Sequence, residues 1–323
     1  MTETAPRRLL RLPLDLLRGF LIGMAELVPG VSGGTVALVT GVYEQLIGSA
    51  SHALTAIKRL VLGPDRWAGF RTEARRTDWL LVVPVLIGMG AAVLTVAGAM
   101  EAFVTDHPED ARGLFLGLVL ASIAVPLRMA ARTPGGASIR LSDVAFFGVA
   151  AVAAFVLVGY ASGREIADPP AWAVFLAAAV AVCALVVPGV SGSFFLLAVG
   201  LYSTTLEAID TRDLRYLSIF AAGAIVGLAS FVQLLHYLLG HHRRATLVTM
   251  AGLMLGSLRA LWPWQASSSE VAGDAHGPGA LVAPYDPVLG PVLLAVLGVL
   301  VVVVLILVED RAARRASEPA PAP

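Results

Sequence analysis

Two short segments of this sequence combine residue types suited to binding an anion. Residues 26–43 read ELVPGVSGGTVALVTGVY, and residues 185–202 read LVVPGVSGSFFLLAVGLY. Proline disfavours helix in the preceding residue and glycine admits unusual dihedrals, so each Pro-Gly pair should interrupt a helix. The interruption exposes backbone N–H donors, the following half-helix presents its positive end, and hydroxyls add further donors. The candidate binding residues for an anion such as phosphate are Pro29, Gly30, Ser32, Gly33, Gly34, Thr35, Pro188, Gly189, Ser191, Gly192 and Ser193.

The competing interpretation of these segments is helix packing. Glycine, serine and threonine also let membrane helices approach closely without binding anything. Two copies of the motif at matching positions favour the binding interpretation, because paired helix breaks in repeated halves are typical of transport sites.

Three charged residues near apolar segments are further candidates. Glu26 lies just before the first break, where an ionisable side chain is expensive in a membrane. It is a candidate carrier of a coupling proton, or it pairs with Arg18, or it caps exposed backbone donors. Glu44 follows the first segment as a second candidate charge, with a solvated position as the alternative. Arg259 precedes two tryptophans, and either collects an anionic headgroup or snorkels to the interface.

The composition predicts the setting of these residues. The chain has 323 residues, of which 57% are hydrophobic and 14% charged, as expected for an all-α polytopic membrane protein rather than a soluble domain. About 20 apolar residues cross a bilayer, and six stretches have this length. They are 79–101, 111–130, 143–161, 216–239, 245–262 and 287–308. Two longer stretches, 14–46 and 172–205, contain the Pro-Gly pairs and predict helical hairpins.

The two motifs belong to an internal duplication. Gly41 and Tyr43 match Gly200 and Tyr202, and GLVLASI at 117–123 matches GLMLGSL at 252–258. The first repeat is predicted over 1–161, with a hairpin at 14–46, a cytoplasmic loop at 48–78 and helices over 79–161. The second is predicted over 162–310, with a hairpin at 172–205 and helices over 214–308. A disordered tail follows at 311–323.

The distribution of basic residues predicts the topology. If both hairpins are re-entrant, 18 of the 23 basic residues lie on one side, which is then the cytoplasm. Both termini are cytoplasmic in this arrangement, and an odd number of crossings per half makes the repeats inverted. Full crossing by both hairpins would instead place the amino-terminal arginines and the basic 48–78 region on opposite sides.

Other ligand classes leave no signal in the sequence. The formal net charge is zero, and no basic patch indicates nucleic acid. No spacing of His, Cys, Asp or Glu indicates a metal site, and no cofactor is expected. A homo-oligomer is compatible with the sequence.

The segments GMAELVPGVSGGTVALVTGVYEQLI at 23–47, VVPGVSGSFFLLAVGLY at 186–202 and GLMLGSLRALWPW at 252–264 resemble the polyprenyl-phosphate transporter family. The resemblance covers about 15 to 308. It implies a translocase, not an enzyme, that returns undecaprenyl phosphate from the outer to the inner leaflet of the bacterial cytoplasmic membrane for cell-wall synthesis. It also implies functional roles for both Pro-Gly motifs, Glu44 and Arg259.

Two alternatives remain open at this stage. Undecaprenyl-pyrophosphate phosphatases also have inverted repeats and a Pro-Gly-x-Ser-Arg-Ser tip, but Gly33 and Gly192 stand where their arginine would be. Phosphoryl chemistry needs such a fixed cation, so the substitution argues against a phosphatase. The second alternative is a secondary transporter of a small anion.

Overall fold

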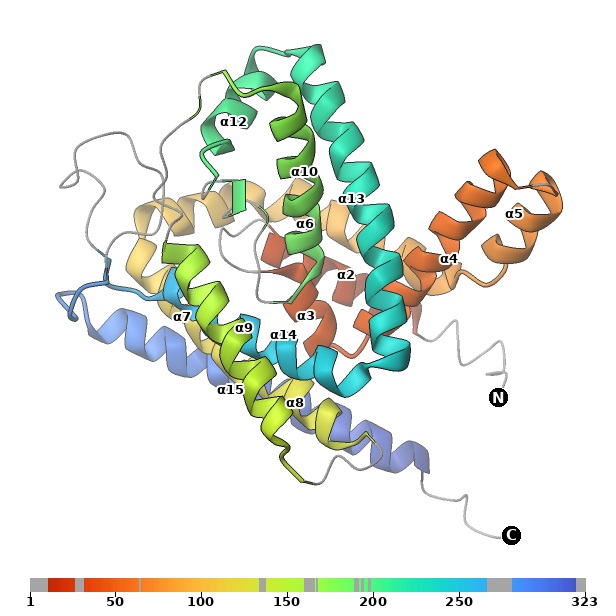
Figure 1. Cartoon of the computed structure of the whole chain (residues 1–323). Helices are drawn as coiled ribbons and strands as arrows, with labels where there is room; N and C mark the ends of the chain where they lie inside the picture. Colours follow the sequence, from red (N-terminus) through yellow and green to blue (C-terminus); the bar gives the residue numbers. More distant parts are fainter. Residues whose placement is uncertain are drawn as a thin grey trace, which may run out of the picture.

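The computed structural model describes residues 11–26, 32–63, 65–133, 138–159, 166, 168–188, 192, 195–196, 199–265 and 281–317. The named elements of these residues are all helices (Figure 1). The first half has α2 (Leu12–Glu26), α3 (Gly33–Val39), α4 (Tyr43–Leu62), α5 (Arg66–Ala74), α6 (Trp79–Asp106), α7 (Pro108–Ser122), α8 (Ala124–Ala131) and α9 (Leu141–Gly159). The second has α10 (Ala171–Val186), α12 (Tyr202–Asp210), α13 (Leu214–His241), α14 (Arg243–Ser257), the 3-10 turn η1 (Leu258–Leu261) and α15 (Leu289–Ser317).

Five segments of the described chain are long and apolar enough to cross a membrane: 79–96, 108–131, 141–159, 214–241 and 289–308. They agree with five of the six predicted spans. The sixth prediction, 245–262, is wrong as a continuous span, because α14 ends at Ser257 and η1 completes the segment. Pro263 disfavours helix in Trp262, so the helix cannot extend further. The 108–131 span is also divided, and Pro126 explains the break because its ring clashes with the carbonyl of Ser122 in a continuous helix.

Two predicted irregular regions are instead helical. The expected loop at 48–78 consists mostly of the end of α4 and the whole of α5. Its alanine, leucine, lysine and arginine residues are strong helix formers. The loop was expected because the segment also contains many charged residues. The expected disordered tail at 311–323 is helical through Ser317, where an Ala/Arg-rich sequence continues α15.

Helices of the two halves pack against each other through glycine. Helix α2 packs on α6 and α10 on α13, but α7 packs on α15 and α9 on α14. A Cβ atom at Gly117 of α7 would overlap the carbonyl oxygen of Ala295, and one at Gly252 of α14 would overlap that of Phe147. These are the same glycines that the duplication matches. Close backbone approach at small residues is how membrane helices associate.

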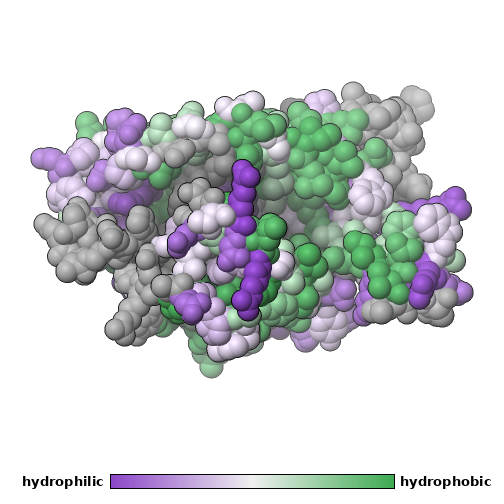
Figure 2. Space-filling model, turned by 90° about the horizontal axis from the view of Figure 1, so that it is seen from above, coloured by the Kyte–Doolittle hydropathy of each residue, from purple (hydrophilic) through white to green (hydrophobic). Residues whose placement is uncertain are grey.

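The surface of the helical assembly is largely apolar. Leu94, Leu141, Val149 and Leu289 are all more than two-thirds exposed, as lipid-facing side chains would be. Figure 2 shows this apolar surface interrupted by hydrophilic residues near the α12–α13 turn and at the α4–α5 end. In Figure 1 the α6–α7 connection and the start of α15 lie at the left, whereas α5 and the end of α15 lie at the right.

Candidate functional site

The first helix break is closed by a carboxylate. Helix α2 ends at Glu26 and α3 begins at Gly33, and the Gly33 N–H donates to Glu26 Oε1 over 2.9 Å. A Cβ atom at Gly33 would overlap this oxygen, so glycine is required for the contact. Of the roles considered for Glu26, capping of exposed backbone donors is therefore confirmed.

Pairing of Glu26 with Arg18 is wrong. The Arg18 guanidinium donates instead to Asp15 Oδ1 over 2.7 Å, three residues earlier on the same helix. The i, i+3 spacing holds these two groups together on one face of α2, whereas Glu26 lies at the end of that helix. The Glu26 carboxylate therefore accepts the Gly33 N–H and has no ion pair with Arg18.

The first break contacts the end of the second hairpin's first helix. The Ser32 hydroxyl lies 3.4 Å from the carbonyl oxygen of Leu185 and 3.3 Å from that of Val187, and donates to them. A Cβ atom at Gly34 would lie 2.9 Å from the carbonyl oxygen of Val186, so glycine permits this approach too. The last carbonyls of a helix have no partner within the helix, and the first break supplies one here.

A tyrosine completes this contact. The Tyr43 hydroxyl donates to the Val186 carbonyl oxygen over 3.0 Å, and its side chain is buried. Donors from the first hairpin therefore reach three consecutive carbonyls, the last two of α10 and that of its C-cap residue Val187. Thr35, also buried, belongs to the same first turn of α3, where its N–H donates to the Ser32 carbonyl.

The arm that follows each break ends in the same turn. Gly41 and Gly200 both have φ near 74°, a left-handed conformation that glycine adopts without strain. The next N–H closes the turn in both cases, from Val42 to Ala37 and from Leu201 to Leu196. This is the glycine-terminated helix end of a Schellman motif. The residues matched in sequence therefore have matching backbone geometry.

The second break is described only in part. Pro188 is fully buried, and Gly192 lies against the Ala181 carbonyl of α10, where a larger residue would not fit. The predicted site residues Pro29, Gly30, Gly189, Ser191 and Ser193 lie outside the described residues. The predicted proximity of Ser32 and Ser191 therefore stays a prediction, although Ser32 contacts the chain just ahead of Ser191.

The remaining charged candidates lie on other elements. Glu44 at the start of α4 forms an ion pair with Arg243 of α14, with 2.9 Å between Oε1 and the guanidinium nitrogen. Arg259 lies in η1, with its guanidinium carbon 4.7 Å from the centre of the Phe155 ring. Its Nη1 also donates to the Phe155 carbonyl oxygen over 3.4 Å. Among the described residues, no hydrogen bond or ion pair joins either side chain to Glu26, Ser32 or Gly33, so the structure does not connect them to the Ser32 contact.

Comparison with known proteins decides the family. The model of the undecaprenyl phosphate translocase-like family matches residues 22–277, which include both breaks, α14 and η1. The chain belongs to this family. It is 33% identical over 254 residues to a polyprenyl-phosphate transporter of Vibrio cholerae, covering 78% of each chain. It is 28% identical over 261 residues to a polyprenyl-phosphate transporter of Staphylococcus aureus, covering 77% of this chain and 86% of that protein. No solved structure matches it.

Family membership and the five apolar helices make the chain a multi-pass membrane protein of the transporter class. Sequence reasoning missed Tyr43 as a site residue, although the duplication had already matched it with Tyr202. A tyrosine beside a predicted helix break was the available signal, since a buried hydroxyl needs a partner.

Proposed function

We propose that this chain moves undecaprenyl phosphate or a closely related polyprenyl phosphate across the bacterial cytoplasmic membrane, without hydrolysis. The proposal extends to this chain what the names of its family and relatives say of them. The observation that carries it is the contact of Ser32 with the α10 carbonyls, because it joins breaks from both halves. The phosphate would bind between these breaks, while the isoprenoid tail stays in lipid.

The proposed architecture is an inverted repeat with two re-entrant hairpins. Helices α2 and α10 have 15 and 16 residues, which at about 1.5 Å per residue is shorter than the roughly 30 Å hydrocarbon core. Helices α7 and α9 of the first half pack on α15 and α14 of the second half, and this reciprocal packing supports a two-fold relation between the halves. Both termini would then be cytoplasmic, as the basic residues favour.

This topology is tested by labelling. Cysteines would replace exposed Arg11 and exposed Thr72, one at a time, in a Cys183→Ala background. We expect both to react with an impermeant maleimide only from the cytoplasmic side. Reaction from opposite sides would rule out a re-entrant first hairpin.

The proposed direction is from the outer to the inner leaflet, with a proton carried by Glu26. An anion approaching the Gly33 N–H meets the Glu26 carboxylate already bound there. Like charges repel, and a proton on Glu26 would remove this repulsion and free the donor. The phosphate and a proton would therefore enter together.

Binding also requires Ser32 to change partners. Its hydroxyl has one proton, which is shared between two protein carbonyls in this structure. A phosphate oxygen would have to accept that proton in their place. In this proposal, the contact of Ser32 with these carbonyls belongs to a closed arrangement that opens when phosphate binds.

The function is tested by labelling surface undecaprenyl phosphate in cells with and without the protein. We expect the outer-leaflet signal to rise when the protein is absent, and Ser32→Ala to raise it partly. Ser230→Ala is the matched control, because that hydroxyl bonds within its own exposed helix. Unchanged labelling in cells lacking the protein would refute the function, whereas phosphate release from undecaprenyl pyrophosphate by pure protein would support the phosphatase alternative.

A further inference from the structure

The α4–α5 hairpin forms a projection that has no counterpart among the described residues of the second half. Helix α4 has 20 residues and is followed by α5, whereas the matching α12 has nine. Figure 1 shows α5 at the right-hand edge of the molecule, away from the breaks. The transport site does not explain why this extension is present.

The outer part of the hairpin exposes apolar side chains. Ile57, Leu60 and Val61 follow the i, i+3, i+4 spacing of one helix face, and all three are exposed. Trp67 on α5 is 67% exposed and stacks on Phe70, with 5.6 Å between the ring centres. Exposed apolar residues gathered in this way indicate a surface that contacts a membrane or another molecule.

The same hairpin carries excess positive charge. Between 57 and 79 the sequence has six basic residues and three acidic ones. Within the described part of the chain, four of these cations have no acidic oxygen within 4.0 Å, so their charges remain available to a partner: Lys58, Arg66, Arg71 and Arg75. In Figure 2 hydrophilic and hydrophobic residues lie side by side at this end.

The far end of α5 is held at the start of a membrane span. Trp79 is the first residue of α6, and its ring N–H donates to the Ala74 carbonyl oxygen over 2.7 Å. Tryptophan at the end of a span is typical of the membrane–water interface. The last residue of α5 therefore lies near the level of the lipid headgroups.

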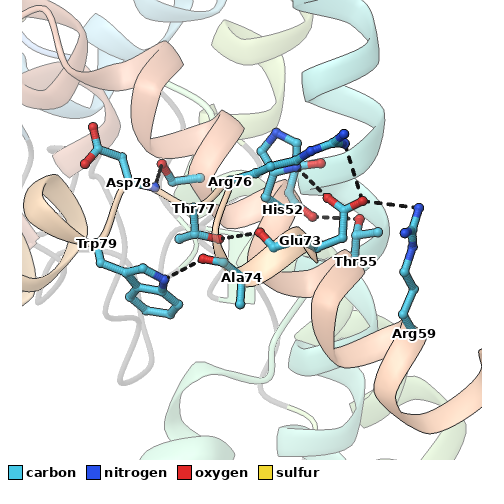
Figure 3. A network of polar contacts seen from close by, with 11 residues as sticks. His52, Thr55, Arg59, Glu73, Ala74, Arg76, Thr77, Asp78 and Trp79 are labelled. Carbon is cyan, nitrogen blue, oxygen red and sulfur yellow. Dashed lines mark hydrogen bonds and ion pairs between the residues drawn. The ribbon is translucent and has the colours of Figure 1, made fainter. Parts of the chain in front are cut away.

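A buried carboxylate fixes α5 against α4 (Figure 3). Glu73 is 3% exposed and contacts His52 over 2.9 Å, Arg59 over 3.2 Å and Arg76 over 3.5 Å. The hydrogen bond from His52 and the two guanidinium groups lower the pKa of the Glu73 carboxyl. The hairpin is thus a preformed unit, and Glu73 forms ion pairs with only two of its six basic residues.

We propose that the α4–α5 hairpin docks on anionic phospholipid headgroups at the surface of the membrane that the protein spans. Trp67 and the Ile57 face enter the interfacial region, and Arg66, Arg71 and Lys58 contact lipid phosphates. Exposed apolar side chains of α4, the exposed Trp67 of α5 and the basic residues beside them together provide the groups with which peripheral helices bind anionic bilayers. Positive charge on the hairpin and negative charge on the lipid favour this occupant over a second copy of the chain.

Hydrogen–deuterium exchange of the full chain in nanodiscs tests the proposal without measuring transport. One set would contain phosphatidylcholine alone, and the other equal parts phosphatidylcholine and phosphatidylglycerol. We expect amides of 66–74 to exchange severalfold more slowly in the anionic set. Each removed cation should weaken docking about fivefold, so Arg66→Gln with Arg71→Gln should abolish the difference.

Two controls keep the result interpretable. Arg212→Gln with Arg215→Gln removes the same charge near the α12–α13 turn and should leave the exchange of 66–74 unchanged. Trp67→Ala should raise the exchange in both lipids, while unchanged exchange in α6 shows that the variants are folded. Equal exchange of 66–74 in both lipid sets, or slow exchange that survives loss of both arginines, would overturn the proposal.

Discussion

Substitution of Glu26 separates its capping role from its proposed proton-carrying role. Glu26→Ala removes the acceptor that the structure gives to the buried Gly33 N–H. An unsatisfied buried donor costs about 1–3 kcal/mol, and the loss of a charged acceptor lies toward the upper end. We therefore expect the alanine variant to unfold at lower temperature in detergent than the native protein.

Glu26→Gln keeps an oxygen acceptor at the same place but carries no charge. A neutral hydrogen bond is weaker than a charged one by about 1 kcal/mol, so this variant should be nearly as stable as the native protein. Because it resembles the protonated acid, phosphate binding should no longer require a proton. Transport by the glutamine variant should then lose its dependence on a pH gradient across the membrane.

The assay measures flipping of fluorescent polyprenyl phosphate in proteoliposomes with and without an imposed pH gradient. Glu207→Gln on α12 removes a carboxylate elsewhere and should change neither stability nor gradient dependence. If Glu26→Ala is as stable as the native protein, the capping contact contributes nothing. If Glu26→Gln keeps the native gradient dependence, Glu26 does not carry the proton.

Four further outcomes follow from the structure. Gly117→Ala should lower the unfolding temperature in detergent, because its Cβ overlaps the Ala295 carbonyl and costs about 1–3 kcal/mol of stability. Gly148→Ala, whose Cβ meets no atom within 4 Å, should unfold at the native temperature. Tyr43→Phe should slow flipping in proteoliposomes while costing about 1 kcal/mol, and full activity would contradict a role for its hydroxyl at the hairpin contact. Arg259→Lys should raise surface-exposed undecaprenyl phosphate in cells and Arg259→Ala should raise it more, since lysine cannot match two phosphate oxygens; native labelling in both would leave Arg259 as an anchor. The pKa of Glu73 is lowered by folding, so its stabilisation of α5 is present above the usual value of 4.5 and is lost as pH falls through the lowered value. The protection of 66–74 in phosphatidylcholine nanodiscs, taken relative to the intrinsic exchange rate at each pH, should therefore fall only below about pH 4.5.

Much of the fold was predictable because spans and repeats depend on local composition. Five of the predicted apolar segments are confirmed by the length and apolar composition of their helices, and the matched Gly41 and Gly200 adopt the same turn. The division of 245–262 was harder to predict, because Trp262–Pro263 stops a helix whose apolar pattern continues. The helices in 48–78 were missed because polar surface helices and polar loops have similar composition.

The candidate site was predictable in its residue types but not in its partners. The Pro-Gly pairs and Ser32 mark a break in any membrane helix. Nothing local shows that Ser32 and Tyr43 reach carbonyls of α10, because that contact joins residues more than 140 positions apart. Glu26 was a candidate from its position, but whether it met Arg18 or Gly33 depended on the geometry of the chain between them.

The exchange of helix partners between the halves has a consequence for how the protein is made. Helix α7 leaves the ribosome early, but the helix that covers Gly117 is α15, which is synthesised after every other described helix. Until then the glycine face of α7 must be held in lipid or by the insertion machinery without its native neighbour. A chain that stops after α14 would therefore insert its earlier helices and still leave α7 uncovered, which is the kind of surface that membrane quality control removes.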